Sequence, residues 1–136
     1  MRKSNDCLAH GLTPLLIDSH ALLWSVGDDH LLSPAVHEVL SAGVVPAYVS
    51  AASIWEIAIK QASGKLNAPE NLLDKVAAAR FIELKITFEH AIIAGALPPH
   101  HGDPFDRMIV AQAQSENLTL VTNDERIAAY DVPVLW

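Results

Sequence analysis

The sequence predicts a three-layer α/β/α protein, in which helices cover both faces of a central, mostly parallel sheet. Two observations lead to this prediction. Short apolar runs that suit buried strands alternate with segments whose apolar residues have helical spacing. The 136 residues suffice for one core, and no run reaches the ~20 apolar residues of a membrane-spanning helix. We therefore expect one soluble domain over residues 14–136.

The first 13 residues are expected to form a loose N-terminal extension, because they lack an apolar segment of the length that a signal peptide needs. The single cysteine of the chain, Cys7, lies within this extension. Disulfides therefore contribute nothing to the fold, and a reducing cytoplasm is the expected location.

The first predicted elements alternate between strand and helix. Residues 15–17 form a continuous apolar run, which is typical of a strand buried on both faces, and a short helix over 20–25 follows. Residues 33–43 suit a second helix, because they begin with a Ser-Pro pair fit for an N-cap and first turn and end in glycine. Residues 44–49 are predicted to form the second strand.

The middle of the chain is predicted to add two helices and an edge strand. One helix begins at Ser50 or Ser53 and ends near Gln61, and Pro69 opens the other. Residues 82–86 alternate strictly between apolar and charged side chains, which is typical of a strand with one solvent-exposed face. We place this strand near the edge of the sheet.

The last third of the chain is predicted to complete the sheet. Thr87 caps a helix, and the proline-rich residues 98–102 form a loop. Residues 103–117 begin with Asp-Pro, which suits an N-cap and first turn of a longer helix. Two further strands are predicted at 118–122 and 132–135, with a short helix between them.

The charge balance limits which partners the chain can bind. Sixteen acidic against nine basic side chains give a net charge of −7, which argues against broad, sequence-independent affinity for nucleic acid. An RNA substrate would therefore need a local attraction. A bound divalent cation could supply it, or four basic residues if they gather at the rim of a site: Lys60, Lys65, Arg107 and Arg126. A basic partner protein is also electrostatically plausible.

Acidic residues recur where predicted strands end or helices begin: Asp18, Glu56, Asp103, Asp106 and Asp124. The carboxyl ends of parallel strands meet at one edge of a sheet, so these side chains can converge in one crevice. Clustered carboxylates repel one another unless a cation is present, and oxygen ligands suit Mg²⁺ or Mn²⁺ rather than zinc. The pattern predicts a metal-dependent enzyme that cuts phosphodiester bonds.

Each acid at a predicted helix start also has a purely structural interpretation. Asp18, Asp103 and Asp124 suit helix N-caps, and Asp106 suits the positive end of a helix dipole. No single position decides between a cap and a ligand. Their recurrence in one small domain exceeds what capping requires and favours a shared site.

For Glu56 the spacing itself favours a structural role. It can form a capping box with Ser53 and an i,i+4 ion pair with Lys60. If Ser50 is the N-cap instead, Glu56 lies in the second helical turn and can point toward Asp18.

Other polar and aromatic residues give weaker signals. His100 and His101 lie in the proline-rich loop and are expected to be solvated rather than ligating. Arg107 is expected to form a surface ion pair in preference to holding a phosphate. The three tryptophans are interpreted as core or interface residues rather than platforms for base stacking: Trp24, Trp55 and Trp136.

Four segments together resemble the PIN-domain ribonucleases of the VapC toxin type, which belong to type II toxin-antitoxin systems. The segments are Leu16–Trp24, Val49–Lys60, Asp103–Arg107 with 111–113, and Leu120–Asp124. The likeness runs from about Leu15 to Trp136, with the motifs in the order of that family.

The resemblance implies a parallel sheet flanked by helices, with acids gathered at one end around Mg²⁺ or Mn²⁺. Asp18 matches the acid of the first strand, Glu56 the helix acid, Asp106 the acid before the late helix, and Asp124 the final acid. Asp103 is an additional acid of this subgroup. The family match, and not the spacing, assigns Glu56 to the site.

The function implied by the resemblance is hydrolysis of RNA by a metal-dependent endoribonuclease, the toxin of a toxin-antitoxin pair. Asp18 and Asp106 would be direct metal ligands, while Glu56 and Asp124 would hold water or complete a second ion site. A cognate antitoxin and a homodimer are the implied partners. Two alternatives stay open: a PIN nuclease in RNA processing without an antitoxin, and a non-catalytic interaction module of the same fold.

Overall fold

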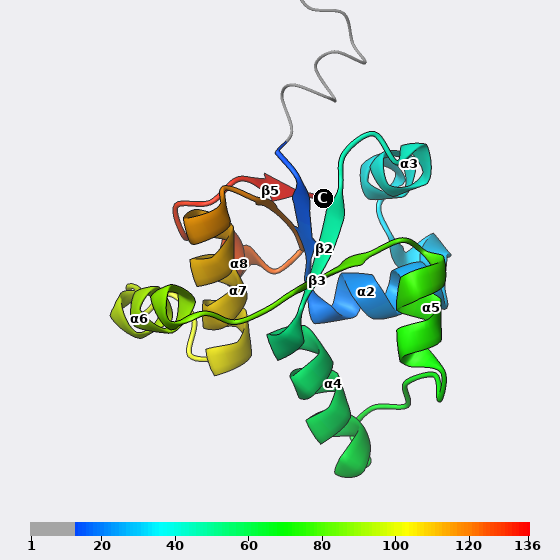
Figure 1. The fold of residues 1–136 in the computed structure, drawn as a ribbon, viewed down its shortest axis with the longest axis horizontal. Coiled ribbons are helices and arrows are strands. Elements are labelled where there is room, and N and C mark those ends of the chain that lie inside the picture. Colours follow the sequence, from blue (N-terminus) through cyan, green and yellow to red (C-terminus); the bar gives the residue numbers. More distant parts are fainter. Residues whose placement is uncertain (1–12) are drawn as a thin grey trace, which may run out of the picture.

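Five parallel strands form the central sheet of the computed structural model, which describes residues 13–136 (Figure 1). The order in the sheet is β3-β2-β1-β4-β5. The strands are β1 (Leu15–Ile17), β2 (Ala47–Ser50), β3 (Ile82–Leu84), β4 (Thr119–Val121) and β5 (Val134–Leu135). The predicted parallel sheet is confirmed, and the predicted extension lies outside the described residues apart from Thr13.

Helices cover both faces of this sheet, so the three predicted layers are confirmed (Figure 1). They are α2 (Ser19–Val26), a 3₁₀ turn (Asp29–Leu31), α3 (Pro34–Ala42), α4 (Ala51–Ala62), α5 (Leu72–Ala78), α6 (Phe88–Ala96), α7 (Pro104–Glu116) and α8 (Glu125–Ala128). Within residues 13–136, no helix combines the length and the apolar character needed to cross a membrane.

Side chains of β1 alternate between two apolar cores, one on each face of the sheet. Leu15 and Ile17 belong to a cluster that includes Leu22 of α2 and Val36 of α3. Leu16 points the other way, into a second cluster built largely by α7 and β4. All three strand residues are buried, which explains why the sequence shows no alternation here.

Several boundaries differ from the predicted ones. β2 begins at Ala47 rather than at Val44, because Pro46 has no N–H to donate and Val44 is exposed in the preceding loop. α5 begins at Leu72 rather than directly after Pro69. The alternating strand β3 lies at the edge of the sheet, as predicted, with its Ile82 side chain largely exposed.

The chain reverses its direction of travel across the sheet at β1. It adds β2 and β3 on one side, then crosses over to add β4 and β5 on the other. The carboxyl ends of β1 and β4, paired from Leu15 with Thr119 to Ile17 with Val121, therefore border the topological switch point. In sheets of this kind such a point leaves a crevice in which ligands bind.

Candidate functional site

Asp18 follows β1 directly at the switch point. Its backbone N–H donates to the Val121 carbonyl at 3.1 Å, and its Oδ1 accepts from the Ala21 N–H at 2.8 Å as the N-cap of α2. Burial raises the pKa of this carboxyl, although hydrogen bonds from Thr122 and Ala21 oppose the shift. Asp18 is therefore both the N-cap of a helix and an acid at the carboxyl end of a strand.

Glu56 reaches the same crevice from α4, which begins immediately after β2. Ser50 is the N-cap, so the alternative with Glu56 in the second turn is the observed one. Glu56 is 5 % exposed as a residue, and its carboxylate accepts from Ser19 Oγ at 2.5 Å and from Lys60 Nζ at 2.7 Å. The i,i+4 ion pair therefore exists, and its hydrogen bond raises the pKa of Lys60.

Asp103 and Asp106 open α7 and behave differently. Asp103 is the N-cap, and its Oδ1 accepts from the N–H groups of Phe105 at 2.8 Å and Asp106 at 3.2 Å. The carboxyl of Asp106 makes no capping bond and turns into the crevice. Burial, reinforced by the charges of Asp103 and Glu56, raises its pKa to about 7.

Asp124 enters from the loop after β4 as the N-cap of α8. Its Oδ1 accepts from the Arg126 N–H at 2.8 Å. Burial alone would raise the pKa of Asp124, but the Arg126 N–H and the hydrogen bond to His101 outweigh it and lower the pKa.

All five predicted acids line one cavity of about 350 Å³. The other residues around it are Ser19, His20, Lys60, His101, Asn123 and Arg126. Burial and then the charges of Asp103 and Glu56 raise the pKa of Asp106, and carboxylate oxygens are the ligands that Mg²⁺ and Mn²⁺ prefer. The donor set therefore fits a hard divalent ion.

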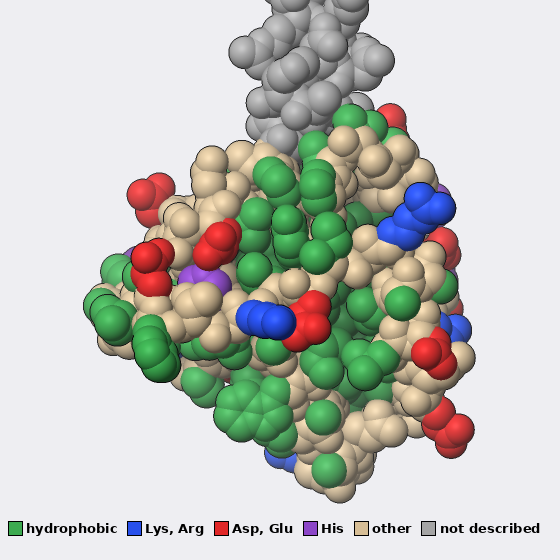
Figure 2. Space-filling model, in the orientation of Figure 1, with side chains coloured by type: hydrophobic (Ala, Val, Ile, Leu, Met, Phe, Trp, Pro, Cys, Tyr) green, Lys and Arg blue, Asp and Glu red, His purple; other side chains and the backbone are tan. Residues whose placement is uncertain are grey.

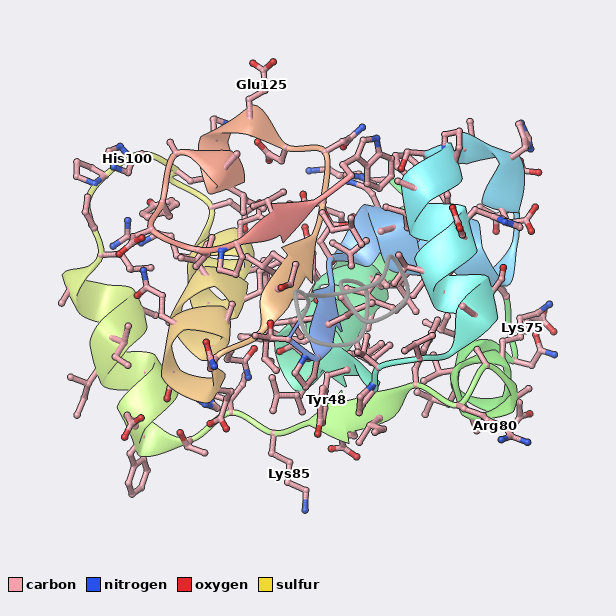
Figure 3. The ribbon with its side chains drawn as sticks, turned by 90° about the horizontal axis from the view of Figure 1, so that it is seen from above. Tyr48, Lys75, Arg80, Lys85, His100 and Glu125 are labelled. Atoms are coloured by element: carbon pink, nitrogen blue, oxygen red, sulfur yellow. The ribbon has the colours of Figure 1, made fainter. Side chains whose placement is uncertain are left out.

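The prediction that His101 is solvated is wrong. The side chain is buried between two of the acids, with Nε2 at 3.0 Å from Asp106 Oδ2 and 3.1 Å from Asp124 Oδ2. Its Nδ1 accepts from the Asp103 N–H at 3.1 Å. The neighbouring His100 is exposed on the loop, as expected (Figure 3). The sequence feature that could have indicated the position of His101 is a histidine two residues before the Asp-Pro start of a helix.

The expected surface ion pair of Arg107 is also wrong. Its guanidinium donates at 3.0 Å to each of three carbonyl oxygens where α6 ends and the loop begins, those of Ala94, Leu97 and Pro98. Tyr130 Oη supports the same loop, because it donates to the Pro98 carbonyl at 2.7 Å and accepts from the His101 N–H at 3.0 Å. Together they fix the loop that carries His101.

Three of the four predicted basic residues do gather at the site. Lys60 and Arg126 line the acidic cavity, and Lys65 lines an adjoining hollow of about 280 Å³ that shares Ser19 and Glu56 with it. Figure 3 views the molecule from the opposite pole, where Lys75 and Arg80 lie at the periphery near α5. The positive charge at the site therefore comes from Lys60, Lys65 and Arg126.

The tryptophans divide between core and surface. Trp24 and Trp136 pack against each other and against the core beside α2, with ring centroids 5.7 Å apart. Trp55 is 61 % exposed and meets Phe105 edge-to-face at 5.2 Å, so it is not a core residue.

A larger cavity of about 620 Å³ lies at the opposite ends of the strands, lined by residues 39–47 and 78–81. Arg80 is the one ionisable side chain among its lining residues, so this cavity has no groups for acid-base or metal chemistry. The acidic crevice is the candidate site.

Comparisons with known proteins agree with the fold. A sequence model of the family described as "PIN domain" matches residues 15–133. The structure is similar to VapBC2 from Rickettsia felis bound to a promoter DNA fragment (15 % identity, 90 % of this chain and 98 % of that chain, TM-score 0.67). It is also similar to DNA-bound VapBC from Salmonella typhimurium (19 %, 91 % and 98 %, TM-score 0.68). A toxin-antitoxin complex from Klebsiella pneumoniae is a third such structure (19 %, 90 % and 96 %, TM-score 0.62). No curated protein gave a significant match.

Proposed function

The chain belongs to the PIN-domain family, whose members are nucleases, and from this premise we propose that it is a metal-dependent ribonuclease and the toxin of a type II toxin-antitoxin pair. The observation that carries the proposal is the convergence of four acids on one cavity at the switch point of the sheet: Asp18, Glu56, Asp106 and Asp124. A non-catalytic module of the same fold would have no use for such mutually repelling charges.

The hydrogen bonds of the acids support a division of roles. Both oxygens of Glu56 and both of Asp124 already accept from protein donors. Asp106 Oδ1 makes no hydrogen bond within residues 13–136, which leaves it free to bind a divalent ion directly. Asp18 accepts from the Ala21 N–H and from Thr122, and we propose it as the second direct ligand because it lies at the carboxyl end of the first strand, with Glu56 and Asp124 acting through water. A bound Mg²⁺ or Mn²⁺ would supply charge neutralisation at the scissile phosphate and a more acidic water.

The remaining chemistry falls to the side chains of the cavity. A carboxylate of the cluster orients the attacking water and takes its proton. Lys60 and Arg126 offer positive charge to the RNA backbone at the rim, which offsets locally the net charge of −7. We place this activity in the cytoplasm, where the RNA is.

A protein partner is supported by the surface and by the structural neighbours, three of which are themselves toxin-antitoxin complexes. Figure 2 shows hydrophobic surface over the edge of the sheet and on toward α4. Ile82 of β3 and Trp55 of α4 are among the exposed large hydrophobic side chains. We propose that a cognate antitoxin with a basic segment covers the acidic site, and that the toxin forms a homodimer.

Induction of the chain in a bacterial host tests the proposal. Asp18→Asn keeps a helix cap while removing a charge from the crevice, and Asp74→Asn on the exposed side of α5 is the matched control. We expect growth arrest and discrete RNA ends from the unaltered protein and from the control, but not from Asp18→Asn. Equal toxicity of all three would reject the nuclease. Arrest that no co-expressed antitoxin candidate relieves would favour a nuclease of RNA processing.

A further inference from the structure

We propose that His101 is a positioning residue that aligns Asp106 and Asp124 by donating its Nε2–H to an oxygen of each carboxyl group, and that it is not itself a metal ligand. The inference concerns the site of the proposed nuclease and rests on that function where it speaks of a metal. At first sight the geometry suggests the opposite, because one ligand atom each of His101, Asp106 and Asp124 lie within 4.8 Å of one another.

The hydrogen-bond network assigns the proton of the ring. Nδ1 lies 3.1 Å from the backbone nitrogen of Asp103, which is a donor. A ring nitrogen that accepts a hydrogen bond carries no proton, so the proton of the neutral imidazole is on Nε2. Nε2 in turn lies 3.0 Å from Asp106 Oδ2 and 3.1 Å from Asp124 Oδ2, at normal hydrogen-bond distances from two acceptors.

This arrangement is the reverse of that of a metal-binding histidine. Such a ligand offers the lone pair of one nitrogen to the metal and donates the other N–H to a carboxylate or carbonyl oxygen. Here the group that faces Nδ1 is a backbone N–H at the start of α7, which cannot become an acceptor. If Nε2 bound a metal, the proton would have to sit on Nδ1, directly against the Asp103 N–H.

The alternative orientation of the imidazole ring does not satisfy the same partners. Rotation by 180° would place a carbon atom opposite the Asp103 N–H and another opposite the two carboxyl groups, so that all three hydrogen bonds of the ring would be lost. The side chain is buried, and its backbone N–H is held by Tyr130 Oη at 3.0 Å. The orientation is therefore fixed by contacts on three sides.

The consequence is a cation site whose protein ligands are all oxygen atoms. His101 holds one oxygen of Asp106 and one of Asp124, so that the two carboxylates keep a fixed separation before any ion binds. Removing the imidazole should weaken binding of every divalent ion to a similar degree, by about 10- to 100-fold for a residue of this kind. It should not change the order of preference between Mg²⁺ and Zn²⁺.

Nuclear magnetic resonance of the ¹⁵N-labelled full-length protein tests the proton assignment directly. Long-range ¹H–¹⁵N correlations distinguish the two tautomers, and His101→Gln identifies the His101 signals by their loss. We expect a proton on Nε2 both without metal and with saturating Mg²⁺, and no scalar coupling between Nε2 and added ¹¹³Cd²⁺. A proton on Nδ1, or a ¹¹³Cd coupling to Nε2, would overturn the inference.

Metal titrations of variants test the positioning role. In His101→Ala we expect Mg²⁺ and Zn²⁺ affinities to fall by similar factors, and in His101→Gln, whose amide can still donate, to recover in part. His30→Ala, at an exposed site beside Asp28, is the control. Selective loss of Zn²⁺ binding in His101→Ala would show a nitrogen ligand and contradict us. Should His101→Ala not fold, the tautomer measurement on the unaltered protein still decides.

Neither measurement depends on RNA cleavage. A protein with the Nε2–H tautomer that never cuts RNA would reject the proposed function but keep the assignment of His101. A protein that cuts RNA with the opposite tautomer would reject the assignment alone.

Discussion

At the scale of the residue, Asp106 is the side chain whose environment departs most clearly from that of an ordinary aspartate. Its pKa is raised to about 7, first by burial and then by the charges of Asp103 and Glu56. Sequence spacing indicated that Asp106 lies at a helix start but gave no sign of this environment. Its cause is convergence of α4 and α7, whose first turns are about fifty residues apart in the chain.

The metal-free protein is expected to lose stability as the pH rises from about 4 to about 7. In the unfolded chain Asp106 has its ordinary pKa of 3.8, so it has released its proton in this window, whereas the folded protein retains the proton. Folding therefore takes up a proton, and a rise in pH lowers the free energy of unfolding. The shift corresponds to about 4 kcal/mol at about 1.4 kcal/mol per unit. We expect about 2 kcal/mol, because the carboxyl is partly solvated.

The measurement is urea unfolding in chelator at pH 5 and pH 8, for the unaltered protein and for Asp106→Asn. The variant should lose most of the pH dependence and be the more stable protein at pH 8, with a residual slope from Asp18, whose pKa burial also raises. Asp74→Asn should behave like the unaltered chain. An Asp106→Asn protein with the full pH dependence would disprove this account of the crevice.

At the scale of the element, the loop between α6 and α7 shows where sequence reasoning stops. The helix starts at Thr87 and Asp103 could be predicted from capping chemistry, and the structure confirms both. The contacts of Arg107 with carbonyl oxygens up to thirteen residues earlier could not be predicted. The sequence does not show whether an arginine lies on the surface or packs against a loop. Its role depends on how α6 packs on α7.

Replacing Arg107 should therefore destabilise the fold much more than replacing an exposed cation. Arg107→Ala leaves three carbonyl oxygens at the end of α6 without their charged donor, which we expect to cost about 3 kcal/mol. Lys85, which points away from the molecule in Figure 3, gives the control Lys85→Ala, with an expected change within about 0.5 kcal/mol. Chemical denaturation measures both. Equal effects of the two substitutions would mean that the loop is held by Tyr130 and packing alone.

At the scale of the whole molecule, topology converts scattered acids into one site. The sequence suffices to predict strands ending at Ile17 and near Val121, and to predict that parallel strands deliver Asp18 and Asp124 to the same edge. It does not reveal that β1 lies between β2 and β4, or that the helices carrying Glu56 and Asp106 bring these residues to the same cavity as Asp18. In this order β1 is the central strand, and its side chains are buried in both apolar cores.

A site assembled from so many elements should couple metal binding to the stability of the whole domain. An ion that binds only the folded chain, at a free concentration of 100 times its Kd, adds about 2.7 kcal/mol to the free energy of unfolding. This corresponds to about 5 to 10 °C in Tm for a domain of this size.

We expect Mg²⁺ to raise the Tm of the unaltered protein and of Asp74→Asn at pH 7.5. It should leave Asp18→Asn nearly unchanged, because this variant loses one of the two proposed direct ligands. Differential scanning calorimetry gives the shift at several Mg²⁺ concentrations. If neither Mg²⁺ nor Mn²⁺ changes the Tm of any of the three proteins, the cavity does not hold a divalent ion. The acids must then be explained as helix caps alone.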